Sequence, residues 1–368
     1  MVTHYRVITT SKKSSARTGQ LRTAHGTVTT PAFMPIATRG AVKTLSAEDM
    51  QYVQSDILLS NTYHLWQRPG LRVIKKFGGL HDFMQWPGPI LTDSGGYQVF
   101  SLSQRRTITE RGVKFVSEMD GQTLFLTPEK AIDIQHTLGS DIIMVLDECP
   151  PYPTTASYAE TSMELTTRWA ARAITQYKKK KIRNQLLFGI VQGATFPELR
   201  QRHAQELRQL PFHGYAVGGL AVGEPEETMY SMLDATVPYL PTEKPRYLMG
   251  AGKPEQIIEA VRRGIDMFDC VIPTRNARHG LLYVWRTTSL KGKFYDVVHI
   301  KRAQYQNDTT PIDRLSSVTT SKKYSRAYLR HLFMMGDPLA LRLASLQNVG
   351  FYLELMRRLR VGIKGGTL

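Results

Sequence analysis

The sequence predicts an α/β protein of the (β/α)8 barrel class. Short, nearly continuous apolar runs alternate with segments of helical spacing, and this alternation recurs about eight times along the 368 residues. Runs that are apolar throughout indicate strands buried on both faces, as in a parallel sheet. The runs lie at 31–38, 56–63, 89–96, 141–148, 186–193, 215–223, 246–252 and 267–274.

Helix start signals separate these runs. Ser46 precedes AEDMQYV, Thr127 precedes Pro128, and Pro197 and Pro254 open two further segments, so that side-chain caps and first-turn prolines recur. Strand followed by helix, repeated in this way, predicts a closed barrel of parallel strands. A doubly wound open sheet is the alternative, but no G-x-G-x-x-G follows the first run.

The pattern changes near residue 285, where the chain becomes polar and basic with little helical period before amphipathic segments return. We therefore expect a barrel core over residues 1–284 and an inserted subdomain over 285–335. A basic C-terminal helix within 336–368 would then complete the barrel.

Composition bounds the partners and the compartment. Lys and Arg number 48 against 31 Asp and Glu, a net charge of +17 that favours a polyanion such as nucleic acid, although a generally basic solubility surface is the alternative. Only Cys149 and Cys270 are present, which excludes a disulfide framework and a multi-cysteine metal cage. With no apolar run of about 18 residues, we expect a cytoplasmic protein without a membrane segment.

Polar residues stand where the apolar runs end. Barrel enzymes build their sites from the carboxyl ends of strands, so we expect these residues to converge. Asp269 lies within such a run, where an unpaired carboxylate is costly. It either faces a ligand, or caps the next loop or pairs with Arg275. The residues concerned are Asn61, Asp93, Asp147, Gln192, Gly218, Gly219 and Asp269.

Six longer strings occur in one order, and together they closely resemble the tRNA-guanine transglycosylases of the bacterial type. The resemblance implies a (β/α)8 barrel enzyme, a homodimer in the family's usual form. It implies removal of the wobble guanine from tRNAs whose anticodon begins with guanine-uridine, and insertion of 7-aminomethyl-7-deazaguanine, the queuosine precursor. The strings are TDSGGYQVFSL (92–102), GSDIIMVLDECPPYP (139–153), GIVQG (189–193), VGGLAVGE (217–224), YLMGAG (247–252) and FDCVIPTRNARHG (268–280).

Exchange of a base at C1′ of a ribose is glycosyl transfer through a transition state that resembles an oxocarbenium ion. Retention of the β configuration requires two inversions, so a carboxylate attacks C1′ and is then displaced. The resemblance implies that Asp269 is this nucleophile and that Asp93 is the general acid and base. From the sequence alone, the reverse assignment of the two carboxylates stays open.

The resemblance also implies a set of base-binding residues. Asp147 would accept the N1–H and amine of guanine, Gln192 and the Gly219 N–H would donate to O6, and carbonyl groups around Leu220 would bind an aminomethyl group. Tyr97 and Met249 would stack on the two faces of the base. The remaining implied base-binding residues are Ser94 and Cys149.

Base choice and tRNA contacts follow from four further positions. Val222 and Cys149 differ from the residues that resemblance assigns to queuine-using enzymes, which favours the smaller precursor without excluding queuine. Arg275 and Arg278 match residues that read the uridines beside the wobble guanine, whereas ion pairing at the barrel rim is the alternative.

One region departs from the family. The resemblance implies a structural zinc held by three cysteines and a histidine, but Ser316, Val318, Ser321 and Gln347 occupy those positions. Two alcohols, a hydrocarbon and an amide do not make a tetrahedral zinc site. We therefore expect no zinc and no other cofactor, and a subdomain stabilised by packing.

Two other classes of protein compete with the transglycosylase hypothesis. A non-catalytic tRNA-binding homologue would tend to lose catalytic acids, yet both Asp93 and Asp269 are present. A barrel glycoside hydrolase also pairs two carboxylates, but it would need neither Asp147 nor a strongly basic exterior.

Overall fold

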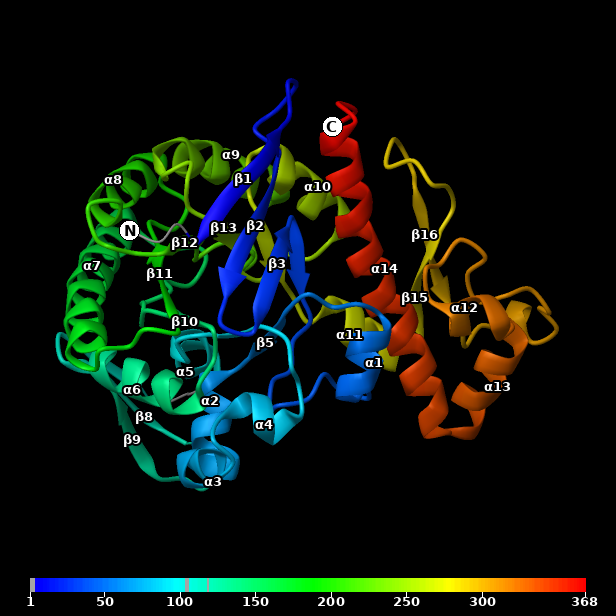
Figure 1. Ribbon diagram of the computed structural model, residues 1–368, viewed down its shortest axis with the longest axis horizontal. Helices are drawn as coiled ribbons and strands as arrows, with labels where there is room; N and C mark the ends of the chain where they lie inside the picture. Colours follow the sequence, from blue (N-terminus) through cyan, green and yellow to red (C-terminus); the bar gives the residue numbers. More distant parts are fainter. Residues whose placement is uncertain (1–3, 103–105, 118) are drawn as a thin grey trace.

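Eight parallel strands form the centre of the protein, a computed structural model that describes residues 4–102, 106–117 and 119–368 (Figure 1). Each of the eight predicted apolar runs contains or overlaps one strand, in the spatial order β4-β14-β13-β12-β11-β10-β6-β5. A parallel bridge between Ile36 and Leu59 joins the two ends of this order, so the predicted barrel is confirmed. The strands are β4 (Ala32–Met34), β5 (Leu58–Ser60), β6 (Ile90–Thr92), β10 (Ile142–Met144), β11 (Leu186–Val191), β12 (Gly214–Val217), β13 (Arg246–Leu248) and β14 (Met267–Asp269).

Every residue of these eight strands is buried. Parallel strands covered on both faces need apolar side chains on both, which explains why the runs show no alternation of polar and apolar residues. Asp269 is the last residue of β14 and is buried with it.

Helices surround the strands, and they begin where the sequence signals predict. The Ser46 hydroxyl accepts the Asp49 N–H, and the Thr127 hydroxyl accepts the Lys130 N–H at 3.2 Å. The helices of this part are α1 (Ala47–Tyr52), α2 (Thr62–Leu65), η1 (Trp66–Gly70), α3 (Leu71–Lys76), α4 (Leu80–Met84), α5 (Gly96–Leu102), α6 (Pro128–Leu138), α7 (Ala156–Lys179), α8 (Pro197–Leu207), α9 (Glu226–Thr236), η2 (Val237–Tyr239), α10 (Pro254–Arg262) and α11 (Ile272–Arg278).

The last helix, α14 (Pro338–Lys364), returns to the barrel and packs beside its first strand (Figure 1). The ring of Tyr352 lies 4.9 Å from that of Phe33 in β4, and its hydroxyl donates to the Gly252 carbonyl beyond β13 at 2.5 Å. The C-terminal helix therefore packs on the first strand and on the loop that follows β13.

The segment between α11 and α14 lies to one side of the barrel, against α14 (Figure 1). It comprises the antiparallel hairpin of β15 (Leu281–Trp285) and β16 (Tyr295–His299), then η3 (Ala303–Tyr305), α12 (Thr319–Lys323) and α13 (Arg326–Met335). The division into 1–284, 285–335 and 336–368 stays a prediction. Its first boundary falls inside β15.

Two small antiparallel sheets supplement the barrel. β1 (Tyr5–Thr10), β2 (Arg17–Thr23) and β3 (Gly26–Thr30) precede β4, and β7 (Arg106–Thr109), β8 (Gly112–Val116) and β9 (Thr123–Leu126) lie in the connection between β6 and β10. Neither sheet follows from the strand–helix alternation of the sequence. No helix in the described part of the chain is long and apolar enough to cross a membrane.

Asp266, just before β14, ties the first sheet to the amino end of the barrel. Its buried carboxylate accepts hydrogen bonds from Arg17 Nε at 3.0 Å and Nη2 at 2.6 Å, from the Tyr5 hydroxyl at 2.9 Å and from the Arg246 N–H at 2.8 Å. The Arg17 side chain is also buried, so removal of either charge would leave the other buried without its ionic partner.

Replacement of Asp266 by Ala should lower the free energy of unfolding by about 3 to 5 kcal/mol, because the Arg17 charge stays buried without its partner. Urea denaturation at pH 7 measures this change. Asp234→Ala is the matched control, since Asp234 is 61% exposed in its ion pair with Arg263 and should cost less than about 1 kcal/mol. Equal losses in the two variants would contradict the anchoring role.

Candidate active site

A cavity of about 550 Å³ lies at the carboxyl ends of the barrel strands. The strands are parallel, so the residues that follow them meet at this one edge. All predicted site residues except Gln192 and Arg278 line the cavity. Those that do are Asp93, Ser94, Tyr97, Asp147, Cys149, Gly219, Leu220, Met249, Asp269 and Arg275.

Asp93 follows β6 directly, and hydrogen-bond donors hold both of its oxygens. Oδ1 accepts the Thr62 N–H at 2.8 Å and the Gly95 N–H at 3.2 Å, and Oδ2 accepts the Asn61 amide. Burial raises the pKa of Asp93 to about 6, with a further contribution from the charge of Asp269, although the hydrogen bonds oppose the rise. A carboxyl group that titrates near neutral pH can both give and take a proton.

Asp269 lines the same cavity as Asp93. Its Oδ1 accepts the Tyr247 hydroxyl at 2.6 Å and the Gly250 N–H at 2.9 Å. Within the described residues Oδ2 accepts no hydrogen bond, and no ion pair joins Asp269 to Arg275. Burial raises the pKa of Asp269 against these two bonds. The geometry therefore favours a carboxylate that faces a ligand over one that pairs with Arg275.

Tyr247 keeps this carboxylate in place. Burial and the charge of Asp269 raise the pKa of Tyr247 well above its usual value, so its hydroxyl remains a donor. The sequence analysis missed Tyr247 as a site residue, because an aromatic side chain in an apolar run is typical of a core. Its only signal was its place in the YLMGAG string.

Asp147 lies across the cavity wall from a glutamine. Gln192 Nε2 donates to Asp147 Oδ2 at 2.7 Å, and the Ser94 hydroxyl approaches Oδ1 at 3.3 Å. Burial raises the pKa of Asp147 to about 6 despite these bonds. Gln192 is fully buried behind the wall, and its Oε1 has no hydrogen-bond partner.

Gly219 needs to be glycine for two reasons. Its φ is +65°, which residues with a side chain rarely adopt, and a Cβ at this position would overlap Gln192 Oε1. The absence of a side chain lets the Gly219 backbone lie directly on the Gln192 amide and form the wall.

Other lining residues differ in exposure and charge. Tyr97 lines the cavity with a side chain that is 53% exposed. Burial raises the pKa of the Cys149 thiol to about 12, so it is neutral and no nucleophile near pH 7. The N–H groups of Ala221 and Val222 donate to the Glu224 carboxylate, a loop contact that the sequence analysis did not predict.

The two arginines implied in tRNA contacts lie on α11. Arg275 lines the cavity, whereas Arg278 lies outside it and donates to the Thr274 carbonyl at 2.9 Å. Neither forms an ion pair with a described carboxylate, so the alternative of ion pairing at the rim has no support.

One group of three side chains in the described residues could approach a metal ion, namely His25, His81 and Asp141. The two imidazole rings are stacked, with centroids 3.5 Å and planes 18° apart, so one ion cannot lie in both ring planes. Instead, His25 Nδ1 lies 2.9 Å from one Asp141 oxygen and His81 Nε2 lies 3.1 Å from the other. The geometry is that of two hydrogen bonds to one carboxylate.

The four positions that the resemblance assigns to zinc ligands do not fit a metal either. Gln347 Nε2 donates to the Tyr283 carbonyl at 2.6 Å and to buried Asp313 at 2.9 Å. The Ser316 hydroxyl accepts the Val318 N–H at 3.1 Å, and the Val318 side chain is buried. The polar groups at these positions form hydrogen bonds within the protein, and together the residues supply no tetrahedral ligand set.

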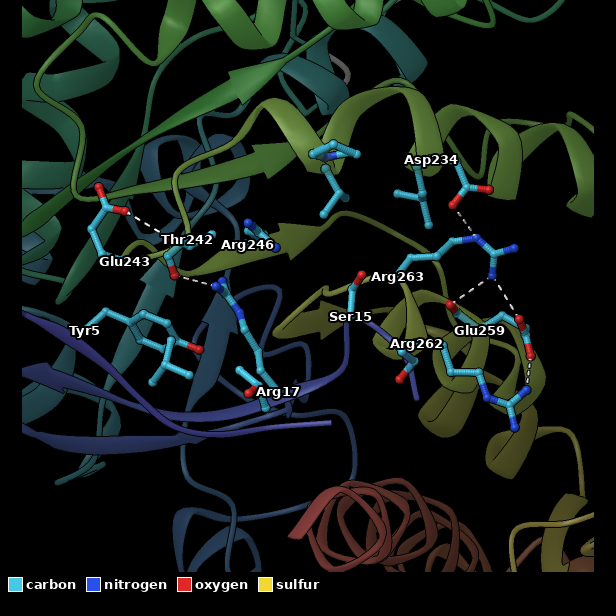
Figure 2. A pocket seen from close by; sticks show the side chains of 16 residues that line it. Tyr5, Ser15, Arg17, Asp234, Thr242, Glu243, Arg246, Glu259, Arg262 and Arg263 are labelled. Carbon is cyan, nitrogen blue, oxygen red and sulfur yellow. Dashed lines mark hydrogen bonds and ion pairs between the residues drawn. The ribbon is translucent and has the colours of Figure 1, made fainter. Parts of the chain in front are cut away.

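A second cavity, of about 1070 Å³, lies at the opposite, amino end of the barrel (Figure 2). Four of its charged side chains are paired with one another: Arg263 lies 3.0 Å from Asp234 and 2.8 Å from Glu259, and Arg262 also contacts Glu259. Its acids, Asp234, Glu243 and Glu259, are not buried, unlike those of the smaller cavity.

A parallel barrel in which buried carboxyl groups with raised pKa values lie at the carboxyl ends of the strands has the architecture of a barrel enzyme. The family model described as Queuine tRNA-ribosyltransferase matches residues 11–368. The chain therefore belongs to the queuine tRNA-ribosyltransferase family, the tRNA-guanine transglycosylase enzymes that its motifs resemble.

Three relatives, each named queuine tRNA-ribosyltransferase, show the extent of the similarity. The protein of Oceanobacillus iheyensis is 49% identical over 364 residues, which is 99% of this chain and 93% of the relative. That of Thermoanaerobacter pseudethanolicus is 49% identical over 364 residues, 99% and 94% of the two chains. That of Mannheimia succiniciproducens is 52% identical over 337 residues, 92% and 86%.

Proposed function

We propose that this protein replaces the wobble guanine of tRNAs whose anticodon begins with guanine-uridine by 7-aminomethyl-7-deazaguanine, in queuosine biosynthesis. The observation that carries this proposal is the meeting of three buried acids, Asp93, Asp147 and Asp269, around one cavity. Family membership supports the class of reaction. We further propose that the enzyme acts in the cytoplasm as a homodimer.

In the first step, Asp269 Oδ2 would attack C1′ of the ribose while the bond from C1′ to guanine breaks. Oδ2 suits this role because the Tyr247 hydroxyl and the Gly250 N–H engage only Oδ1. These two donors stabilise the carboxylate and so assist its departure when the second base attacks C1′.

Asp93 would supply the proton to the departing guanine and recover one from the incoming base. The two half-reactions then leave its protonation unchanged. Its pKa of about 6 supports both roles near neutral pH.

Base recognition would depend on Asp147 and the wall beside it. The Asp147 carboxylate can accept the N1–H and the exocyclic amine, which guanine and its 7-deaza analogues share. The Gln192 Nε2 has a second N–H besides the one given to Asp147, and this N–H and that of Gly219 would donate to O6. Val222 on the wall favours the small precursor over queuine.

Exchange can be tested with an unmodified tRNA of the guanine-uridine class and radiolabelled guanine. We expect incorporation by the wild type and a loss of at least about 1,000-fold in Asp269→Ala, because the nucleophile is removed. The control Asp234→Ala, at the other end of the barrel, should retain activity. Wild-type protein that binds the tRNA but incorporates nothing would instead support the non-catalytic homologue.

The order of the two carboxylates can be decided in the same assay. Acid quenching of the wild type with tRNA, followed by peptide mapping, should find the ribose attached to Asp269. An adduct on Asp93 would establish the reverse assignment. Repeating the exchange with the aminomethyl precursor and with queuine measures base choice.

Guanine binding should weaken about tenfold for each pH unit below about 6. Burial raises the pKa of Asp147 to about 6, so the ionised form that accepts both N–H groups predominates above this pH and is lost as the pH falls. Titration calorimetry between pH 5 and 7 measures the affinity. Asp147→Asn should bind weakly at every pH in this range, and a wild-type affinity that does not change with pH would contradict the role of Asp147.

We also propose that the segment from β15 to α13 folds without zinc. The hydrogen bonds of Gln347 to Tyr283 and Asp313 support this, since they occupy the amide. Metal analysis of purified protein should find less than about 0.1 zinc per chain, and EDTA should leave the unfolding temperature unchanged. About one zinc per chain, with a lower unfolding temperature in EDTA, would be the opposite result.

A further inference from the structure

Arg200 in α8 is fully buried, and its hydrogen bonds within the described residues all go to backbone carbonyls. Its Nε donates to the Ala194 carbonyl at 2.8 Å. Nη1 donates to the carbonyls of Gly218 at 2.8 Å and Val191 at 3.3 Å, and Nη2 to that of Gly219 at 3.2 Å. No described carboxylate forms an ion pair with it.

A guanidinium buried without a carboxylate is costly, because carbonyl groups compensate only part of its lost hydration. Burial lowers the pKa of Arg200 to about 10, so the group is still charged near pH 7. The carbonyls that hold this charge belong to the ends of β11 and β12, the two strands behind the base-binding wall. Arg200 therefore joins two loops of the candidate active site.

His203, one turn further along α8, holds the same wall. Its Nδ1 accepts the Gln192 N–H at 2.8 Å. Burial lowers the pKa of His203 to about 3, so the ring is neutral and Nδ1 remains an acceptor at physiological pH. One face of α8 thus fixes the backbone of Gln192 and the peptides of Gly218 and Gly219.

The contact with the Gly218 carbonyl determines where the next N–H points. In a planar trans peptide the C=O and the following N–H point in opposite directions. With the Gly218 carbonyl directed at Arg200, the Gly219 N–H is directed away from Arg200; Gly219 and Cys149 both line the cavity. Two consecutive glycines would otherwise allow this peptide to rotate freely.

We propose that Arg200 is a positioning residue for base recognition: it holds the peptide between Gly218 and Gly219 so that the Gly219 N–H points at O6 of guanine. The inference rests on the proposed function. It assigns Arg200 a part in discrimination at O6, through the glycine backbone and without contact with the base.

The test compares the affinities for guanine and for 2-aminopurine, which keeps the ring and the exocyclic amine but has no O6. 2-Aminopurine also lacks the N1–H, which Asp147 would accept. Arg200 does not contact Asp147, so the loss of this hydrogen bond should weaken 2-aminopurine equally in the wild type and in the Arg200 variants. In Arg200→Met we expect guanine to bind at least about tenfold more weakly and 2-aminopurine to change less than about threefold. Calorimetry or competition against exchange measures both.

Arg202→Met is the matched control, because Arg202 lies on the same helix but is 42% exposed and forms ion pairs with Glu160, Glu164 and Glu206. Its preference for guanine should equal that of the wild type. Arg200→Lys keeps the charge but not the fork of donors, so its preference should fall by at least about threefold. This variant decides the question if Arg200→Met does not fold.

Equal weakening of both bases in the Arg200 variants, or an unchanged preference for guanine, would overturn the inference and leave the proposed function intact. Wild-type protein that binds neither base would overturn the proposed function, and the inference with it. A loss of affinity for guanine but not for 2-aminopurine, found in the Arg200 variants and not in Arg202→Met, would support the inference.

Discussion

The parallel arrangement of the eight strands is the constraint on which the site depends. Parallel strands all end at the same edge, so residues that follow β6, β10, β12, β13 and β14 surround one cavity although they lie far apart in the chain. The same arrangement buries both faces of each strand. A carboxylate at a strand end, such as that of Asp269, is therefore largely buried, and the cavity is the only opening that it faces among the described residues.

This burial raises the pKa values of the three acids that line the cavity. Desolvation dominates the raised pKa values of Asp93, Asp147 and Asp269, and hydrogen bonds to each oppose it. A carboxyl group near pKa 6 costs stability at neutral pH, because the folded state holds the ionised form at a disadvantage. The free energy of packing the neighbouring strands offsets this cost, as is usual where acids are arranged for a reaction.

Buried polar groups add directional bonds where separate parts of the molecule already pack through apolar side chains. Asp266 joins the first sheet to the amino end of the barrel, Arg200 joins two loops at the other end, and Asp313 with Gln347 joins the β15–β16 hairpin to α14. All four side chains are fully buried, and each bonds a backbone group of another segment. Directional bonds of this kind select one arrangement of loops whose apolar residues would fit several.

The sequence by itself determined the barrel, because eight apolar runs separated by capped helices leave few other ways to bury both faces of a sheet. It also identified most of the cavity residues, since polar residues at strand ends and the six motif strings mark them. Only the tertiary structure revealed Tyr247, Glu224 and Arg200. Tyr247 and Arg200 bond groups of other segments, and Glu224 bonds N–H groups within its own loop. Contacts of these kinds leave no periodic pattern in the sequence.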